Sequence, residues 1–378
     1  MKTRAFVQLA AGLLVAAAAR PASADQVVIA GQYPLSGPMA SYSGPFLREG
    51  TEIAMKRIDE TQMLGKDRTL KVVMEDNAGD RNQAISLMNR FATSDNATAV
   101  LGVYGSYLSL PTAPVANELK VPFLAIAASP AIVQAGPWSF ILIEQPDSSM
   151  KIEAQFAAER LKVRSAAMVF DRANDASVRL KDAFAKYFKE RGGAIVSEDG
   201  ISAQDTNFAP IATKIASEKI DLLFLESVPS VAANFLVQVR QAGLDPSVKL
   251  MASGQVSSPV FRDIAGAAAE GIYYAADYVA DMPAAENRYF VDAYRKRNNN
   301  KDPDQNAAWA YTGMLLLAHA IHDAGPGADR TKVRDALAKL KDVDTPLGAG
   351  KFSYDQERMP VFDLVMLQVV NGAQQLVK

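Results

Sequence analysis

Short apolar runs alternate with longer helical patterns along most of this 378-residue chain. Several runs are continuous blocks of Val, Ile, Leu and Phe, which is typical of strands covered on both faces of a parallel sheet. The strand-like runs are residues 27–30, 70–74, 99–103, 123–126, 166–170, 222–225, 248–252 and 271–275. The helical stretches between them are residues 46–60, 81–94, 149–161, 178–191, 208–217, 230–243 and 307–324. This alternation predicts an α/β fold with parallel sheets built from right-handed crossovers.

So many crossovers exceed what one open sheet holds comfortably, which predicts two Rossmann-like lobes joined by a hinge of several chain segments. The pattern breaks at Gln145-Pro146-Asp147 and again over residues 277–283. We therefore expect residues 25–144 and 276–350 in lobe 1, and residues 145–275 and 351–378 in lobe 2. Near the end, Asn371-Gly372 favours a type I′ hairpin turn.

The first residues differ from the rest of the chain. Lys2 and Arg4 precede an apolar stretch over residues 5–19, and Ala22-Ser23-Ala24 supplies small residues at a cleavage position. This combination predicts a secretory signal peptide over residues 1–24 that is removed after Ala24. No apolar run reaches the roughly 20 residues that span a bilayer.

Charge and cysteine content narrow the possible partners and compartment. The net charge of −2 gives no electrostatic footprint for nucleic acid. The chain contains no cysteine, so we expect neither a disulfide nor a lipid attached through an N-terminal cysteine. We therefore expect a freely diffusing monomer in the periplasm of a cell with two membranes.

The groups that catalysis usually requires are missing. Only two histidines occur, His319 and His322, and their spacing permits a shared metal with only Asp323 close by. Histidines near the end of a helix also interact favourably with its dipole, and we prefer this explanation. Without cysteine, and with both histidines on one predicted helix, we do not expect a nucleophilic triad of the usual kind. Neither a Walker sequence nor a G-x-G-x-x-G motif is present. We expect no enzyme, no metal and no cofactor.

Two neighbouring crossovers each carry a serine just after the strand. In open parallel sheets, ligands bind beyond the carboxyl ends of the strands, where helix N-termini converge. Ser106 follows the run 99–103, and Ser129 follows the run 123–126 directly before Pro130. Such serines can simply cap their helices. Together they predict a pocket of N–H and hydroxyl donors for a carboxylate or another acceptor-rich group.

A series of short motifs runs in order across nearly the whole predicted mature chain and resembles one family. The motifs are Pro34-Leu35-Ser36-Gly37-Pro38, Leu101-Gly102-Val103-Tyr104-Gly105-Ser106, Val121-Pro122-Phe123-Leu124, Arg240-Gln241-Ala242-Gly243-Leu244, Ala269-Glu270-Gly271 and Asp344-Thr345-Pro346-Leu347-Gly348. The ordered set resembles the leucine/isoleucine/valine-binding proteins of the type I periplasmic binding fold. This resemblance implies a substrate-binding protein that holds a small amino acid or related carboxylate between its lobes. It also implies delivery to an ABC permease in the inner membrane.

The resemblance assigns roles to residues of lobe 1. Family members hold the ligand carboxylate with a serine after the third strand, where Ser106 stands. The following loop supplies a carbonyl and a hydroxyl, matched here by Ala127 and Ser129. An aromatic residue of the first loop is matched by Tyr42.

Lobe 2 departs from the family pattern. Asp175 stands where the family often has a tyrosine, and Gly254 stands near the position of a glutamate that pairs with the ligand ammonium. Glu226, directly after a strand, or Asp175 could replace that acid, unless both face solvent. Alternatives therefore stay open: a binding protein for an amine-free aromatic or aliphatic acid or an amide, or a sensory receptor of the same fold.

Overall fold

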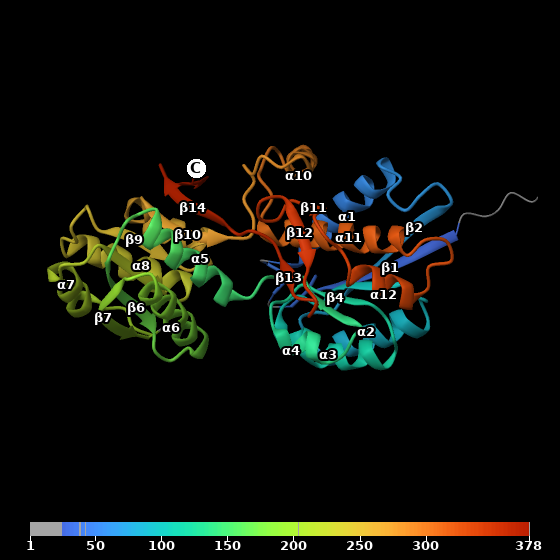
Figure 1. Cartoon of the computed structure of the whole chain (residues 1–378), viewed down its shortest axis with the longest axis horizontal. Coiled ribbons are helices and arrows are strands. Elements are labelled where there is room, and N and C mark those ends of the chain that lie inside the picture. The colour runs from blue at the N-terminus through green and yellow to red at the C-terminus, as the bar shows by residue number, and fades with distance from the viewer. Residues whose placement is uncertain (1–24, 38, 42, 203, 378) are drawn as a thin grey trace, which may run out of the picture.

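The computed structural model describes residues 25–377 apart from Pro38, Tyr42 and Ala203, and it has two lobes joined by a narrow waist (Figure 1). The expected signal peptide and the expected ligand residue Tyr42 lie outside the described residues. Within the described part of the chain, no helix is long and apolar enough to cross a membrane.

Lobe 1 is built on a five-stranded parallel sheet in the order β2-β1-β3-β4-β5. Its strands are β1 Asp25–Tyr33, β2 Arg68–Asp76, β3 Ala99–Gly102, β4 Phe123–Ala125 and β5 Ser139–Ile141. Its helices are α1 Gly44–Glu60, α2 Arg81–Thr93, α3 Ser106–Glu118, α4 Pro130–Gln134, α10 Ala285–Arg297, α11 Gln305–Asp323 and α12 Arg330–Leu337.

Alternation along β1 explains how both faces of this sheet are covered. Val27 and Ile29 pack into a core with α1, α10 and α11, whereas Val28 and Ala30 pack into a second core with α2 and α3. Successive side chains of a strand point to opposite faces, so an apolar run buries both. The α/β fold with parallel sheets is confirmed.

Lobe 2 holds a seven-stranded sheet in the order β15-β14-β10-β9-β8-β6-β7. Its strands are β6 Ser165–Asp171, β7 Ala194–Ile201, β8 Leu222–Glu226, β9 Lys249–Ala252, β10 Ile272–Ala276, β14 Val365–Val370 and β15 Ala373–Leu376. Its helices are α5 Pro146–Glu159, α6 Asp175–Glu190, α7 Ala209–Ser217, α8 Pro229–Gln241 and α9 Pro259–Ala265. The strands from β6 to β10 run parallel, and β14 and β15 add an antiparallel edge.

The chain crosses between the lobes at three places: from β5 to α5, from β10 to α10, and from β13 (Pro360–Val361) to β14 (Figure 1). The expectation that residue 351 begins the return to lobe 2 is wrong. Strands β12 Lys351–Tyr354 and β13 Pro360–Val361 form a small sheet with β11 Val343–Asp344. Phe352 and Phe362 are buried in the lobe 1 core, so the last crossing follows Phe362.

The final hairpin has the turn that its sequence favours. Asn371 and Gly372 join β14 to β15 with φ values of 53° and 73°. A type I′ turn requires positive φ at both central residues, so the expected hairpin is confirmed. The backbone N–H groups of both residues donate to the carboxylate of Glu270.

Candidate binding site between the lobes

The two serines predicted as an anchor lie at neighbouring strand ends of lobe 1. Strands β3 and β4 pair up to Gly102 and Ala125, and beyond them Gly105 N donates to Ile126 O at 2.9 Å. This hydrogen bond ties the two loops together. Ser106 begins α3 and Ser129 directly precedes α4, so both half-buried serines lie at the same edge of the sheet.

The hydroxyls of these serines do not act as helix caps. The N-cap of α3 is Gly105, and the side chain of Ser129 makes no capping hydrogen bond to α4. Within the described residues, neither the Ser106 nor the Ser129 hydroxyl has a hydrogen-bond partner. Both donors are therefore available to a ligand, as plain capping serines would not be.

The loop after β3 is held in an unusual backbone conformation. Gly102, Val103 and Gly105 all have positive φ, at 109°, 54° and 86°. For a β-branched residue such as Val103 this region is a genuine outlier. It is stabilised by Ser109, whose hydroxyl donates to Val103 O at 2.6 Å. Strain of this kind gathers at functional loops. Val103 belongs to one of the motifs found in the sequence, but nothing in that motif predicts its positive φ.

Ala127 is buried, and its carbonyl faces a hinge segment. Ile143 N, on the first crossing, donates to Ala127 O at 3.2 Å. A carbonyl oxygen has two lone pairs, so it can accept a second hydrogen bond. The loop that would hold the ligand is thereby linked to the hinge.

A cavity of about 1040 Å³ lies between the lobes. Lobe 1 contributes Tyr104 and Trp309 to its lining, and the first two crossings contribute Glu144 and Asp277. The lobe 2 residues in its lining include Ala176, Arg179, Leu180, Ser253, Gly254, Gln255, Ser257 and Arg262. Of the predicted ligand residues that the structure describes, Gly254 alone belongs to this lining. Ser106, Ala127 and Ser129 lie at the carboxyl edge of the lobe 1 sheet, outside the cavity wall.

The two acids proposed for lobe 2 have opposite environments. Asp175 is the exposed first residue of α6 and does not line the cavity. Glu226 ends β8 and is fully buried. Its Oε1 accepts from Ser177 Oγ at 3.3 Å and from Gln255 Nε2 at 3.5 Å. Burial raises the pKa of Glu226 to about 7.

Residues at the hinge and next to it line part of the cavity, but the sequence analysis did not assign them to the binding site. Trp309 Nε1 donates to Asp277 Oδ2 at 2.6 Å, and the ring of Tyr104 lies 6.3 Å from the Trp309 ring. Burial raises the pKa of Asp277 to about 6. Burial, together with the charges of Asp277 and Asp363, raises the pKa of Glu144 to about 7. Each of the three crossings thus carries at least one carboxylate.

The described residues offer no cluster of three His, Cys, Asp or Glu side chains suited to a metal ion. His319 and His322 both lie on α11, and burial lowers the pKa of His319. Their spacing brings no third ligand to them in this part of the chain.

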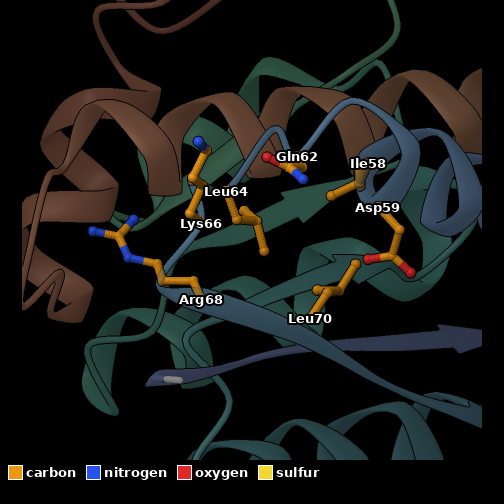
Figure 2. Close-up of a pocket in the computed structure, with 8 residues that line it drawn as sticks. Ile58, Asp59, Gln62, Leu64, Lys66, Arg68 and Leu70 are labelled. Atoms are coloured by element: carbon orange, nitrogen blue, oxygen red, sulfur yellow. The ribbon is translucent and has the colours of Figure 1, made fainter. Parts of the chain in front are cut away.

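A second cavity, of about 500 Å³, opens on lobe 1 (Figure 2). It is lined by Ile58, Asp59, Gln62, Leu64, Gly65, Lys66, Arg68 and Leu70. Arg68 begins β2 and pairs with Asp25 at the start of β1, so this cavity lies at the amino ends of the strands. The Arg68 guanidinium donates to the carbonyls of Ile321 and Gly325 at the end of α11. Because ligands of such sheets bind at the opposite edge, we assign this cavity a structural role.

Comparison with known proteins identifies the family and several similar chains. The sequence profile of the family described as periplasmic binding protein matches residues 26–374. The leucine-, isoleucine-, valine-, threonine- and alanine-binding protein of Pseudomonas aeruginosa is 26% identical over 334 residues, which cover 86% of this chain and 85% of the relative. The branched-chain amino acid transporter substrate-binding protein of Streptococcus pneumoniae, solved with isoleucine, has a TM-score of 0.73 and 26% identity, covering 94% of this chain and all of that one.

A further solved structure carries a different kind of ligand. It is a solute-binding protein of an ABC transporter from Rhodopseudomonas palustris in complex with 3,4-dihydroxybenzoic acid. Its TM-score is 0.73 at 25% identity, and the match covers 93% of this chain and 95% of that one. The match of the family profile to nearly the whole described chain shows that the protein belongs to the periplasmic binding protein family.

Proposed function

We propose that the protein is the substrate-binding component of an ABC importer and binds a small carboxylate-bearing solute between its lobes. The observation that carries this proposal is a pair of hydroxyls at adjacent strand ends of lobe 1, those of Ser106 and Ser129, which have no hydrogen-bond partner among the described residues. Hydroxyl and N–H donors at helix starts suit a carboxylate. The names of the relatives support the same class of solute.

The proposed cycle is a conformational one. The solute first docks on lobe 1, and lobe 2 then closes over it by bending at the three crossings. Exclusion of water strengthens every polar contact in the closed cleft. Closure is a population shift that the solute drives only through its preference for the closed form. A permease then receives the solute from the closed form.

Two classes of solute fit the first step. Amino acids are named for the Pseudomonas and Streptococcus relatives, and an amine-free acid occupies the Rhodopseudomonas protein. Gly254 favours the second class, because it brings no carboxylate to the cavity wall. Glu226 favours the first class, because it places a buried acid behind that wall.

We also propose that the protein acts as a non-catalytic monomer in the periplasm, after removal of residues 1–24. Membership of a solute-binding family supports a binding role. The apolar stretch and small residues before Asp25 support export.

A ligand panel tests the proposed function. Mature protein is titrated with leucine, isoleucine and 3,4-dihydroxybenzoate, and the thermal midpoint and calorimetric affinity are measured. A bound solute should raise the midpoint by mass action. Small-angle scattering should show compaction with the same solute. A solute that binds without compaction would contradict the clamp, and failure of all such acids to bind would overturn the proposed class of solute.

A further inference from the structure

The second and third crossings between the lobes are paired with each other on the lobe 2 side. Strands β10 and β14 are antiparallel neighbours, and their last pair is Ala276 with Val365. Asp277 is the next residue of the second crossing, and Asp363 lies two residues before Val365 on the third. The sheet of lobe 2 therefore fixes these two segments relative to each other up to the pair Ala276 and Val365, and no further.

One loop of lobe 1 holds both crossings just beyond that pair. This loop, residues 345–350, joins β11 to β12, and we call it the latch loop. Gly348 N donates to Asp277 O at 2.7 Å, and Ala349 N donates to Asp363 O at 3.0 Å. Consecutive amides of one loop thus bind the two crossings, so the two segments are joined at both ends.

The latch loop is itself a firm part of lobe 1. Leu347 is fully buried in the lobe 1 core. Two hydrogen bonds within the loop fix its shape: Gly350 N donates to Leu347 O at 2.9 Å, and Thr345 N donates to Gly350 O at 3.1 Å. The amides that hold the crossings therefore keep their positions when lobe 2 moves.

The second crossing is held from lobe 1 at further points after Ala276. The side chain of Asp277 accepts from Trp309 Nε1 at 2.6 Å. Beyond it, the amide nitrogen of the buried Asn287 on α10 donates to three backbone carbonyls, those of Val279, Ala280 and Met282. The backbone of this crossing thus belongs to lobe 1 from Asp277 onward.

Side chains of the same segment still contact lobe 2. Val279 and Met282 are buried in the lobe 2 core, although their carbonyls are held by α10 of lobe 1. Contacts between apolar side chains are not directional, so they tolerate sliding better than hydrogen bonds do. Bending of the backbone is therefore expected before Asp277, where neither lobe holds the junction with Ala276.

Position 348 of the latch loop requires glycine. Gly348 has a φ of 53°, and a Cβ there would lie 2.2 Å from Asp363 O. A side chain at this position would push Asp363 O away from Ala349 N and so separate the third crossing from the loop. The motif at residues 344–348 was noted in the sequence only as part of a family resemblance, and this contact gives its glycine a physical role.

We propose that the latch loop makes the second and third crossings one hinge strut, residues 276–277 and 363–365, and confines its bending to the junction of Ala276 with Asp277 and to Leu364. Lobe 2 then closes on lobe 1 about a fixed pivot. This inference rests on the closure described in the proposed function and adds what determines its path. A fixed pivot limits the number of open geometries, so less freedom is lost when the solute binds. Gly348 is a positioning residue for closure.

The first test measures the distance between the lobes without a ligand. Because the chain contains no cysteine, S86C on α2 and K189C on α6 place one spin label on each lobe, both at exposed positions. Pulsed electron paramagnetic resonance of the mature protein gives the distribution of distances. G348A is the test variant. G327A is the matched control, because Gly327 also has a positive φ, 64°, and a Cβ there would meet no other group within 4 Å.

We expect a wider distribution in G348A than in the parent, and a parent-like one in G327A. Both variants place alanine at a positive φ, but G348A alone displaces a crossing. Circular dichroism checks that both variants fold. If folded G348A keeps the width of the parent, the latch is overturned.

Hydrogen exchange tests the latch in the unmodified protein, whether or not G348A folds. Ala349 is exposed, so protection of its amide depends on the hydrogen bond to Asp363 O. We expect the amides of Gly348 and Ala349 to exchange at least about a hundredfold more slowly than those of an unstructured peptide. Exchange of both amides at peptide-like rates would overturn the latch.

A third measurement connects the latch to binding. Isoleucine and 3,4-dihydroxybenzoate are titrated into G348A, G327A and the parent. A solute that binds the parent should bind G348A at least about threefold more weakly, because a smaller fraction of its open states has the competent geometry. Equal affinity in G348A and G327A would overturn the effect of the pivot on binding. If neither solute binds the parent, the proposed function fails for both, and the ligand-free distances and the amide exchange still decide on the latch.

Discussion

Trp309 Nε1 donates a hydrogen bond to Asp277 Oδ2 across 2.6 Å, which fastens helix α11 of lobe 1 to the second crossing between the lobes. Trp309 is buried, and the carboxylate of Asp277 has its pKa raised by burial. The bond therefore compensates part of the cost of keeping an acid at the hinge.

Replacing Trp309 by phenylalanine should lower the free energy of unfolding by more than the loss of apolar packing alone would. W309F removes the donor and leaves the Asp277 carboxylate unsatisfied, which costs about 1–3 kcal/mol beyond the packing loss. W138F is the matched control, because Trp138 is also buried and its ring contacts Arg334 rather than a carboxylate. Urea unfolding measures both variants. Equal losses in W309F and W138F would contradict an energetic role for the hydrogen bond.

Removal of the anchor hydroxyls should weaken binding without weakening the fold. S106A and S129A should each reduce affinity by about 1–3 kcal/mol, the usual cost of a buried hydrogen bond that is lost. Their thermal midpoints without ligand should stay near that of the parent, because neither hydroxyl has a partner within the described residues.

S109A is the contrasting variant for this experiment. Ser109 lies on the same helix as Ser106, and its hydroxyl donates to the carbonyl of the strained Val103. S109A should therefore lower the thermal midpoint. Unchanged affinity in both S106A and S129A would remove these residues from the site.

The strands that are buried on both faces are the elements that the sequence predicts best. Strands β1, β8 and β9 are predicted because their apolar runs are continuous. β7, Ala194–Ile201, is an edge strand with alternating exposed positions and charged residues, so it lacks such a run. β5 has three residues, which is too short for any period. Apolar alternation at Phe352 and Tyr354 predicts a strand, but it does not say which lobe buries it.

The candidate site divides in the same way. Ser106 and Ser129 follow from strand order, because the carboxyl ends of neighbouring parallel strands meet at one edge. The burial of Glu153, on α5, cannot be inferred from strand order, because a glutamate within a helical stretch is typical of a solvent-exposed helix face. Its burial depends on which face of α5 packs against β10, and this is a tertiary relationship.

Close packing of α1 on α11 makes Gly50 sensitive to one added methyl group. A Cβ at Gly50 would lie 2.1 Å from the backbone oxygen of Ala307. G50A should therefore cost about 3 kcal/mol or more, at the upper end for overpacked sites, because backbone cannot move aside easily. At Gly313 the nearest atom is Leu101 Cδ1, at 2.5 Å. This is the end of a flexible side chain, so G313A should cost less. Denaturant unfolding of both variants checks the order, and a milder G50A would contradict it.

The stability of the protein should fall as pH rises from about 4 to about 7. The pKa values of Glu144 and Glu226 are raised to about 7, and that of Asp277 to about 6. A carboxyl with a raised folded-state pKa contributes stability below its unfolded pKa, near 4, and loses it as pH rises through the folded value. His319 has its pKa lowered by burial and acts in the opposite direction.

The variant E144Q isolates one of these contributions, because that of His319 cancels in the difference from the parent. Across this pH range, the unfolding free energy of E144Q should fall by about 1–2 kcal/mol less than that of the parent, after allowance for the partial exposure of Glu144. D76N is the control of opposite sign: the pKa of Asp76 is lowered by hydrogen bonds from Ser36, Ala78 and Leu35, which outweigh burial. The stabilisation by ionised Asp76 is lost only at pH values below this range. D76N should therefore change the unfolding free energy without changing its pH slope within the range. A parent-like slope in E144Q would mean that the carboxylate of Glu144 is ionised throughout this pH range, which would contradict the raised pKa of this residue.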